Sequence, residues 1–174
     1  GHLSSNDVTI LASSRPLTVE ERQTFHSRYG FEPTEVPIAL DAVAIYVNYQ
    51  NPLQGLTLNQ LDAIFSKTRK RGAPAAITTW GQLGLQEGWE EQPIRFYGRD
   101  RRSGTRTFFL QTALLNGELN PDLREAPGTA MEILDLSRDA AGIGYAGIGF
   151  QASTVRILPI AEKAEDPFVL PTAE

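Results

Sequence analysis

The sequence predicts an α/β fold in which helices flank a mixed, mostly parallel β-sheet. Patterns typical of strands and of helices alternate along the chain, which favours parallel pairing through helical connections. The composition, with 41% hydrophobic and 21% charged residues among 174, is that of a folded domain. No internal repeat is present, and the length suits one compact domain or two small lobes.

Composition and charge exclude several classes of function. Sixteen basic residues against 21 acidic ones give a net charge of −5, so we expect no broad affinity for nucleic acid or anionic lipid. No apolar segment approaches the roughly 20 residues of a membrane-spanning helix, so direct membrane insertion is not expected. The lack of cysteine excludes disulfides and thiolate metal sites. Any anion site must therefore be local.

The beginning of the chain predicts a strand followed by a helix. Residues 8–12 are rich in β-forming side chains and lead into a polar turn. Thr18 and Glu21 match a capping box ahead of a helix over residues 19–29. Gly30 stands where a C-terminal cap is expected, so both ends of this helix are defined.

The next segments alternate in the same way. Apolar, β-branched and aromatic residues fill positions 36–47, which predicts one long buried strand or two joined strands. A second capping box at 57–60 begins a helix whose apolar residues over 58–65 recur along one face. A third box at 79–82 predicts a short helix.

The second half of the chain continues the alternation. Strand patterns cover residues 94–97, 142–145 and 155–158. Helical patterns with apolar residues to bury cover 106–115 and 129–138. The strand at 94–97 therefore runs through a polar loop into a helix, which is the arrangement that most often places a binding site in an α/β protein.

The loop between that strand and that helix carries the strongest candidate site. Arg99 is followed by Ser103, Gly104 and Thr105 where the helix begins. The first N–H groups of a helix have no internal partner, and the helix dipole adds positive potential there. Gly104 permits close approach, the two hydroxyls add donors, and a guanidinium fork suits phosphate or carboxylate oxygens. These four residues predict a site for an oxygen-rich anion.

A structural alternative exists for the same residues. Ser103 can simply cap a helix, and the arginines can form a solvated face. However, four of the eight positions from 99 to 106 are arginine in an acidic chain, with Asp100 as the one carboxylate among them. This concentration of positive charge favours anion binding over the structural alternative.

A second candidate lies at Ser13, Ser14 and Arg15, where the first predicted strand precedes the first predicted helix. Taken alone, this segment is most simply a turn before that helix. Two strand ends that face one cleft would, however, converge on one ligand, as in open α/β sheets. Ser14 is therefore a predicted second contact for the anion.

Other chemistries find little support in the sequence. No lysine follows Gly104, so a nucleotide P-loop is disfavoured. His26 is the one histidine beyond the first few residues, and it stands inside a predicted helix, so we name no metal ligand and no cofactor. Ser103 as a nucleophile would need a base that the sequence does not clearly offer. Phe108, Phe109 and Tyr97 are predicted core residues.

Several segments together resemble a known family. They are residues 12–17, 42–48 with 51–53, 58–65, 79–80, Arg99 with 103–105, and 142–145, in this order and spacing. They resemble the PstS-like phosphate-binding periplasmic proteins that serve phosphate ABC transporters. The resemblance implies a periplasmic-binding-protein fold of type 2, binding of inorganic phosphate without a reaction, and an exported location. It also implies a membrane permease as partner.

The resemblance also implies roles for particular residues. In that family the positions that match Arg99, Ser103, Gly104 and Thr105 hold phosphate oxygens. Ser14 stands where well-known members have an aspartate that reads the proton on phosphate, so discrimination against sulfate is expected to differ. Arg15 could compensate for that change.

The family implies a clamp of two lobes. Residues 41–142 match one lobe that is complete, whereas residues 8–40 and 143–174 match parts of the other, so the chain is expected to be truncated at both ends relative to the family. Two further functions stay open on the sequence: an enzyme of phosphate-ester chemistry, and an interaction or adhesion module of the same fold without a ligand.

Overall fold

The computed structural model describes residues 10, 13, 16–37 and 42–171. The chain divides into two compact units, Gly1–Leu40 and Asp41–Glu174, and each is described by itself. Among the described residues, no helix is both long enough and apolar enough to cross a bilayer.

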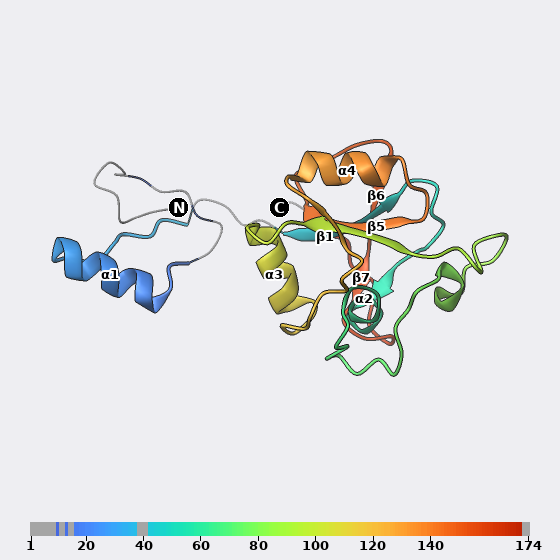
Figure 1. Ribbon diagram of the computed structural model, residues 1–174, viewed down its shortest axis with the longest axis horizontal. Helices are drawn as coiled ribbons and strands as arrows, with labels where there is room; N and C mark the ends of the chain where they lie inside the picture. The colour runs from blue at the N-terminus through green and yellow to red at the C-terminus, as the bar shows by residue number, and fades with distance from the viewer. Residues whose placement is uncertain (1–9, 11–12, 14–15, 38–41, 172–174) are drawn as a thin grey trace. The chain divides into compact units, whose positions relative to one another are not determined.

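The first unit contains helix α1, Val19–Tyr29, with the bounds that its capping box predicts (Figure 1). The Thr18 N–H donates to Glu21 Oε2 at 2.8 Å, and the Glu21 N–H donates to Thr18 Oγ1 at 3.2 Å. Gly30 ends the helix in the left-handed region, with φ of 77°, and donates its N–H to the His26 carbonyl. Both predicted caps are confirmed.

The second unit is built on a five-stranded sheet with the order β4-β3-β5-β1-β6 (Figure 1). Its strands are β1 (Val43–Asn48), β3 (Arg95–Arg99), β4 (Arg124–Ala126), β5 (Gly142–Gly147) and β6 (Val155–Leu158). A second sheet pairs β2 (Leu56–Thr57) with β7 (Ile160–Ala161) in parallel. β3 runs parallel to β4 and β5, whereas β1 runs antiparallel to β5 and β6. Three of these five pairings are parallel, which confirms the mixed, mostly parallel α/β fold.

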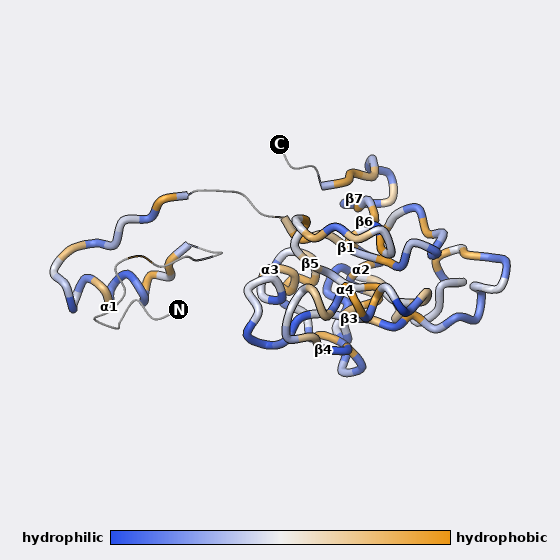
Figure 2. The backbone as a smooth tube through the Cα atoms, turned by 90° about the horizontal axis from the view of Figure 1, so that it is seen from above, coloured by the Kyte–Doolittle hydropathy of each residue, from blue (hydrophilic) through white to orange (hydrophobic). Residues whose placement is uncertain are grey.

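Helices cover both faces of the larger sheet (Figure 1). They are α2 (Leu58–Phe65), the short 3₁₀ helix η1 (Trp80–Leu83), α3 (Gly104–Thr112) and α4 (Thr129–Ser137). Alternate residues of β1 serve the two layers: Ala44 and Tyr46 pack in the cluster with α4, and Ile45 and Val47 in the cluster with α2 and α3. None of the residues of α1 is buried, and Figure 2 shows hydrophobic and hydrophilic residues interleaved along it.

Two predictions for the N-terminal part differ from what the structure describes. The strand predicted at 8–12 lies outside the described residues, except for one exposed position that forms no strand. The long buried strand predicted over 36–47 is wrong in extent, because Val36 is exposed and β1 begins at Val43. Pro37 follows Val36 and cannot donate to a strand ladder, which gives a physical reason for the shorter strand.

The remaining elements agree with the sequence apart from their ends. The strand predicted at 94–97 continues to Arg99, and the helix predicted at 106–115 begins earlier, at Gly104, because Ser103 is its N-cap. Strands β2, β4 and β7 were not predicted, since two or three residues cannot show a period-two alternation.

All the described residues from 42 to 171 belong to one compact unit. Strand β5 lies between β3 and β1, so the C-terminal part of the chain completes the same sheet. The predicted division into a complete lobe over 41–142 and a partial lobe over 8–40 and 143–174 refers to two-lobed relatives, and it stays a prediction.

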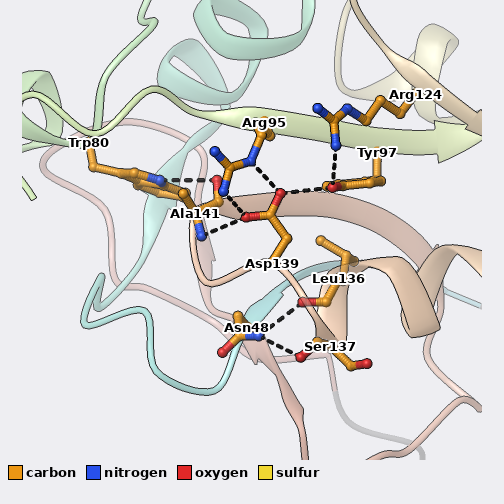
Figure 3. Close-up of polar contacts among 9 residues, drawn as sticks. All are labelled: Asn48, Trp80, Arg95, Tyr97, Arg124, Leu136, Ser137, Asp139 and Ala141. Atoms are coloured by element: carbon orange, nitrogen blue, oxygen red, sulfur yellow. Dashed lines mark hydrogen bonds and ion pairs between the residues drawn. The ribbon is translucent and has the colours of Figure 1, made fainter.

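Polar contacts around Asp139 join β3 and β4 to the turn before β5 (Figure 3). Asp139 is buried and accepts hydrogen bonds from the Arg95 guanidinium, from the Tyr97 hydroxyl at 2.8 Å and from the Ala141 N–H at 3.0 Å. Arg124 donates to the Tyr97 hydroxyl at 2.9 Å. Burial raises the pKa of Asp139, but the hydrogen bonds from Arg95 and Tyr97 outweigh burial and hold that pKa below its usual value.

Replacing Asp139 by Asn should lower the free energy of unfolding at pH 7 by about 2 kcal/mol, between the values typical of exposed and buried ion pairs. Because the folded carboxyl has a lowered pKa, its stabilisation is complete above the unfolded pKa of about 4 and is lost as pH falls through the lower folded value. Urea unfolding of both proteins at pH 7 and at pH 3 measures the difference, which should shrink in acid. Equal stabilities at pH 7 would contradict this role.

Candidate anion-binding site

The end of β3 passes through a tight loop into the first turn of α3. The Asp100 N–H donates to the Ala126 carbonyl at 3.1 Å, and Asp100 Oδ1 accepts the Arg102 N–H at 3.1 Å. The Ser103 N–H then donates to the Asp100 carbonyl at 3.2 Å. The first bond ties the loop to β4 and the other two close the loop on itself, and Ser103 follows as the N-cap of α3.

The first turn of α3 presents backbone donors. Ser103 is buried and its Oγ accepts the Arg106 N–H at 3.4 Å, so one of the orphan amides of the helix is capped. The N–H groups of Gly104 and Thr105 precede any intrahelical acceptor, and no bond within the described part of the chain occupies them. Two adjacent amides at the positive end of a helix dipole are therefore available to an anion.

Arg99 is the last residue of β3 and is half-buried. Its Nη1 donates to Thr129 Oγ1 at 2.8 Å and its Nη2 to the Pro127 carbonyl at 3.4 Å, so the guanidinium lies at the start of α4. Its Nε is buried and has no hydrogen-bond partner among the described residues. The structure describes no bond from Arg99 to Ser103 or Thr105.

The other three arginines of this segment have separate roles. Arg106 is mostly buried and donates to the Arg99 carbonyl at 2.9 Å, and it also pairs with Glu125. Arg102 is 91% exposed and pairs weakly with Asp100, as expected of a solvated face. Arg101 is exposed as well. The structural alternative therefore holds for part of the arginine cluster, and Arg99 remains as the candidate ligand.

The far end of α3 is fixed by the basic loop before η1. Arg71 Nε donates to the Ala113 carbonyl at 2.6 Å, and Lys70 Nζ donates to the Asn116 carbonyl at 2.9 Å. Cationic groups at the carbonyl end of a helix stabilise its dipole and satisfy its orphan acceptors. The helix that carries the candidate site is thus anchored at its opposite end.

A close contact between β3 and β5 sets the position of the junction. A Cβ on Gly98 would lie 2.6 Å from the Tyr145 ring, which leaves no room for a side chain. The Tyr145 ring stacks on Phe109 of α3, with centroids 4.0 Å apart. The prediction that Tyr97 and Phe109 belong to the core is confirmed, but the same prediction for Phe108 is wrong, since Phe108 is 49% exposed.

Sequence reasoning missed two residues next to this site, both on α4. Thr129 accepts the bond from Arg99, and Glu132 is fully buried with its Oε1 accepting the Tyr145 N–H at 2.9 Å. Burial raises the pKa of Glu132 to about 8, against the lowering effects of that hydrogen bond and of the Arg99 charge. One signal was available: Glu132 precedes Leu136 by four positions and so lies on the apolar stripe of the helix.

The remaining predicted site residue, Ser14, lies outside the described residues, so its contacts are not placed. His26 belongs to the first unit, and its Nδ1 lies 3.2 Å from Glu32 Oε1. Ser103 Oγ has Arg106 N–H as its described partner rather than a base. Within the described ranges, no three metal-ligating side chains gather where they could hold an ion.

Comparison with known proteins gives matches along nearly the whole chain. The family model described as the PBP superfamily domain matches residues 2–174. The chain is 42% identical over 167 residues to the phosphate-binding protein PstS of Pseudomonas aeruginosa, which covers 96% of this chain and 52% of that protein. It is 29% identical over 146 residues to protein SphX of Synechococcus elongatus, covering 84% and 41%. The chain thus spans about half the length of the curated relatives it matches.

Solved structures agree with these matches. An ABC-type phosphate transport receptor from Vibrio cholerae superposes with a TM-score of 0.59 at 26% identity, over 73% of this chain and 49% of that one. PstS from Borrelia burgdorferi superposes with a TM-score of 0.62 over 92% of this chain and 58% of that one. At 22% identity the second likeness shows the fold alone. The predicted fold and the predicted resemblance are confirmed.

The contact between Gly98 and Tyr145 can be tested by adding one methyl group. Gly98→Ala should destabilise the protein by about 2 kcal/mol, as overpacking usually does. Gly149→Ala is the matched control, because no heavy atom lies within 4 Å of a Cβ there, and it should change stability by less than about 0.5 kcal/mol. Urea unfolding of both variants measures the effect, and equal stabilities would show that the junction is not set by this contact.

Proposed function

Because the chain belongs to the PBP superfamily, we propose that it binds inorganic phosphate, as part of a solute-binding protein for phosphate uptake. One observation carries the proposal: the amides of Gly104 and Thr105, which have no partner among the described residues, follow Arg99 in a chain that is 42% identical to a phosphate-binding protein. The relatives that support it are named for binding and transport, and no catalytic step is proposed.

The chemistry of the junction suits a tetrahedral dianion. The amides of Gly104 and Thr105 and the hydroxyl of Thr105 can each donate to a phosphate oxygen. Arg99, whose guanidinium lies at the start of α4, is proposed to add a full positive charge, and its Nε has no partner among the described residues. A net charge of −5 for the whole chain means that attraction must come from these local groups rather than from the overall field.

Selectivity would follow from desolvation. A buried donor left without an acceptor costs about 1 to 3 kcal/mol, so an anion with fewer acceptors than the site has donors binds poorly. Ser103, which is already buried as the N-cap, is proposed to orient the first turn and to add its hydroxyl to the ligand. Ser14 stays a proposed contact on the strength of the family resemblance.

The proposed partner and location also come from the relatives. The Vibrio cholerae protein is named an ABC-type phosphate transport receptor, which supports a membrane permease as partner and an exported location for this chain. The division into lobes, 41–142 and 8–40 with 143–174, is proposed on the same basis. The chain spans about half the length of its curated relatives. The proposed partner, location and lobes are therefore those of a full-length protein of the same family.

Calorimetric titration with inorganic phosphate tests the proposal. Arg99→Gln should weaken phosphate binding about 10- to 100-fold, since a hydrogen bond to a charged group is worth about 1.5 to 3 kcal/mol. Arg102→Gln is the matched control, because it removes the same charge only three positions along the chain. The Arg102 side chain is 91% exposed. It should leave the affinity within about twofold.

Two results would contradict the proposal. Wild-type protein that gives no heat with phosphate would remove phosphate binding altogether. Equal losses of phosphate affinity in the two arginine variants would show that binding depends on the total charge of the protein rather than on the β3–α3 junction. Thermal unfolding of each variant confirms that the comparison is made between folded proteins, and a titration with sulfate reports the selectivity.

A further inference from the structure

Glu132 occupies the place where β3 separates from β5. The pairing of β3 with β5 covers Arg95 with Gly142 and Phe96 with Ile143, and no later pair, whereas β1 stays paired with β5 as far as Gly147. Beyond the last β3 pair, the Tyr145 N–H is accepted by Glu132 Oε1 at 2.9 Å. The carboxyl therefore replaces a strand partner of β5 at the point where β3 separates from β5, while β3 stays paired with β4 as far as Arg99.

The space for this carboxyl is built into β5. A Cβ on Gly144 would lie 2.8 Å from Glu132 Oε1 and 2.8 Å from Leu136 Cδ1, so the carboxyl lies where a side chain at this position would have to displace it. Glu132 has no exposed surface, and its Oε2 has no hydrogen-bond partner among the described residues. One turn earlier on the same helix, Thr129 accepts the bond from Arg99 Nη1. A single turn of α4 thus contacts both the Arg99 guanidinium and the backbone of β5.

The charged and titratable groups on the elements packed against α4 are few. They are Arg95, Tyr97 and Arg99 on β3, Arg124 and Glu125 on β4, Tyr145 on β5, Tyr46 on β1 and Arg156 on β6, with Asp135 on α4 itself, and Arg95 is paired with Asp139. Of these, Arg99 is the cation whose charge acts on Glu132, although the two side chains form no ion pair within 4 Å. Glu125 is paired with Arg106, and Arg156 donates to the Asn51 and Leu53 carbonyls.

We propose that Glu132 is a positioning residue whose protonation controls the strength of anion binding at the β3–α3 junction. The neutral carboxyl holds the Tyr145 amide and leaves the charge of Arg99 for the ligand. The ionised carboxyl adds a buried negative charge behind Arg99, which opposes a bound anion. The inference rests on the proposed function, since it assumes that the junction holds phosphate.

The sign of the effect follows from linkage. Burial raises the pKa of Glu132 to about 8, so the carboxyl is mainly neutral at pH 6.5 and ionises as pH rises through that value. Ionisation of Glu132 weakens the binding of the anion. By reciprocity, the bound anion raises the proton affinity of the Glu132 carboxyl. Phosphate affinity should therefore decline in alkaline solution for a reason that lies in the protein rather than in the ligand.

Calorimetric titration of inorganic phosphate from pH 6.5 to pH 9.5 tests this with wild type, Glu132→Gln and Asp135→Asn. Glutamine keeps the acceptor for the Tyr145 amide but cannot ionise. The titration of phosphate itself is common to all three proteins and cancels in the ratio of their dissociation constants. The ratio of wild type to Glu132→Gln should be near 1 at pH 6.5 and rise about fivefold by pH 9.5. The ratio for Asp135→Asn should stay constant.

The outcomes separate the two claims. Phosphate that fails to bind the wild type overturns the proposed function and this inference with it. Phosphate that binds with a constant ratio for Glu132→Gln overturns the inference alone. Carbon-13 titration of the carboxyls in wild type covers the case of a variant that does not fold. One carboxyl should titrate above pH 6 and shift further upward with phosphate, and the lack of such a carboxyl would overturn the inference.

Discussion

The site depends on the contact of Gly98 with the Tyr145 ring, which leaves no room for a side chain one residue before β3 ends at Arg99. Because the same ring stacks on Phe109, the helix is held against the sheet at the very point where the strand leaves it. Arg99 is thus presented by a strand, and Gly104 begins a helix, with a closed loop between them. Donors on regular elements keep their geometry better than donors on loops, which a site for a small anion requires.

Charge around the junction is distributed so that the Arg99 cation stays available in an acidic chain. Arg71 neutralises the carbonyl end of α3, and Arg106 ties the junction to Glu125. Arg99 instead donates to neutral acceptors, the hydroxyl of Thr129 and a backbone carbonyl. Among the described residues, no carboxylate lies within ion-pair distance of its guanidinium. The buried Glu132 extends the same arrangement, because burial raises its pKa to about 8 and it adds a negative charge near Arg99 only when it ionises.

The sequence predicts features whose causes are local. The caps at Thr18 and Thr57 follow from residues three positions apart, and the strand, loop and helix around Ser103 follow from short-range periodicity. Features that depend on contacts between distant segments could not be predicted this way. The space beside Gly144 in β5 and the Glu132 carboxyl that occupies it are examples. The local sequence indicates them only through a charged residue on the apolar stripe of a helix.

The account depends most directly on the first amides of α3 being the groups that receive the anion. Proton–nitrogen correlation spectra of the protein, recorded while inorganic phosphate is added, report each amide separately. The account predicts that the resonances of Gly104 and Thr105 move furthest and to lower field, as expected for amides that gain a charged acceptor. Saturable changes that leave those two amides in place and centre on another segment would contradict it.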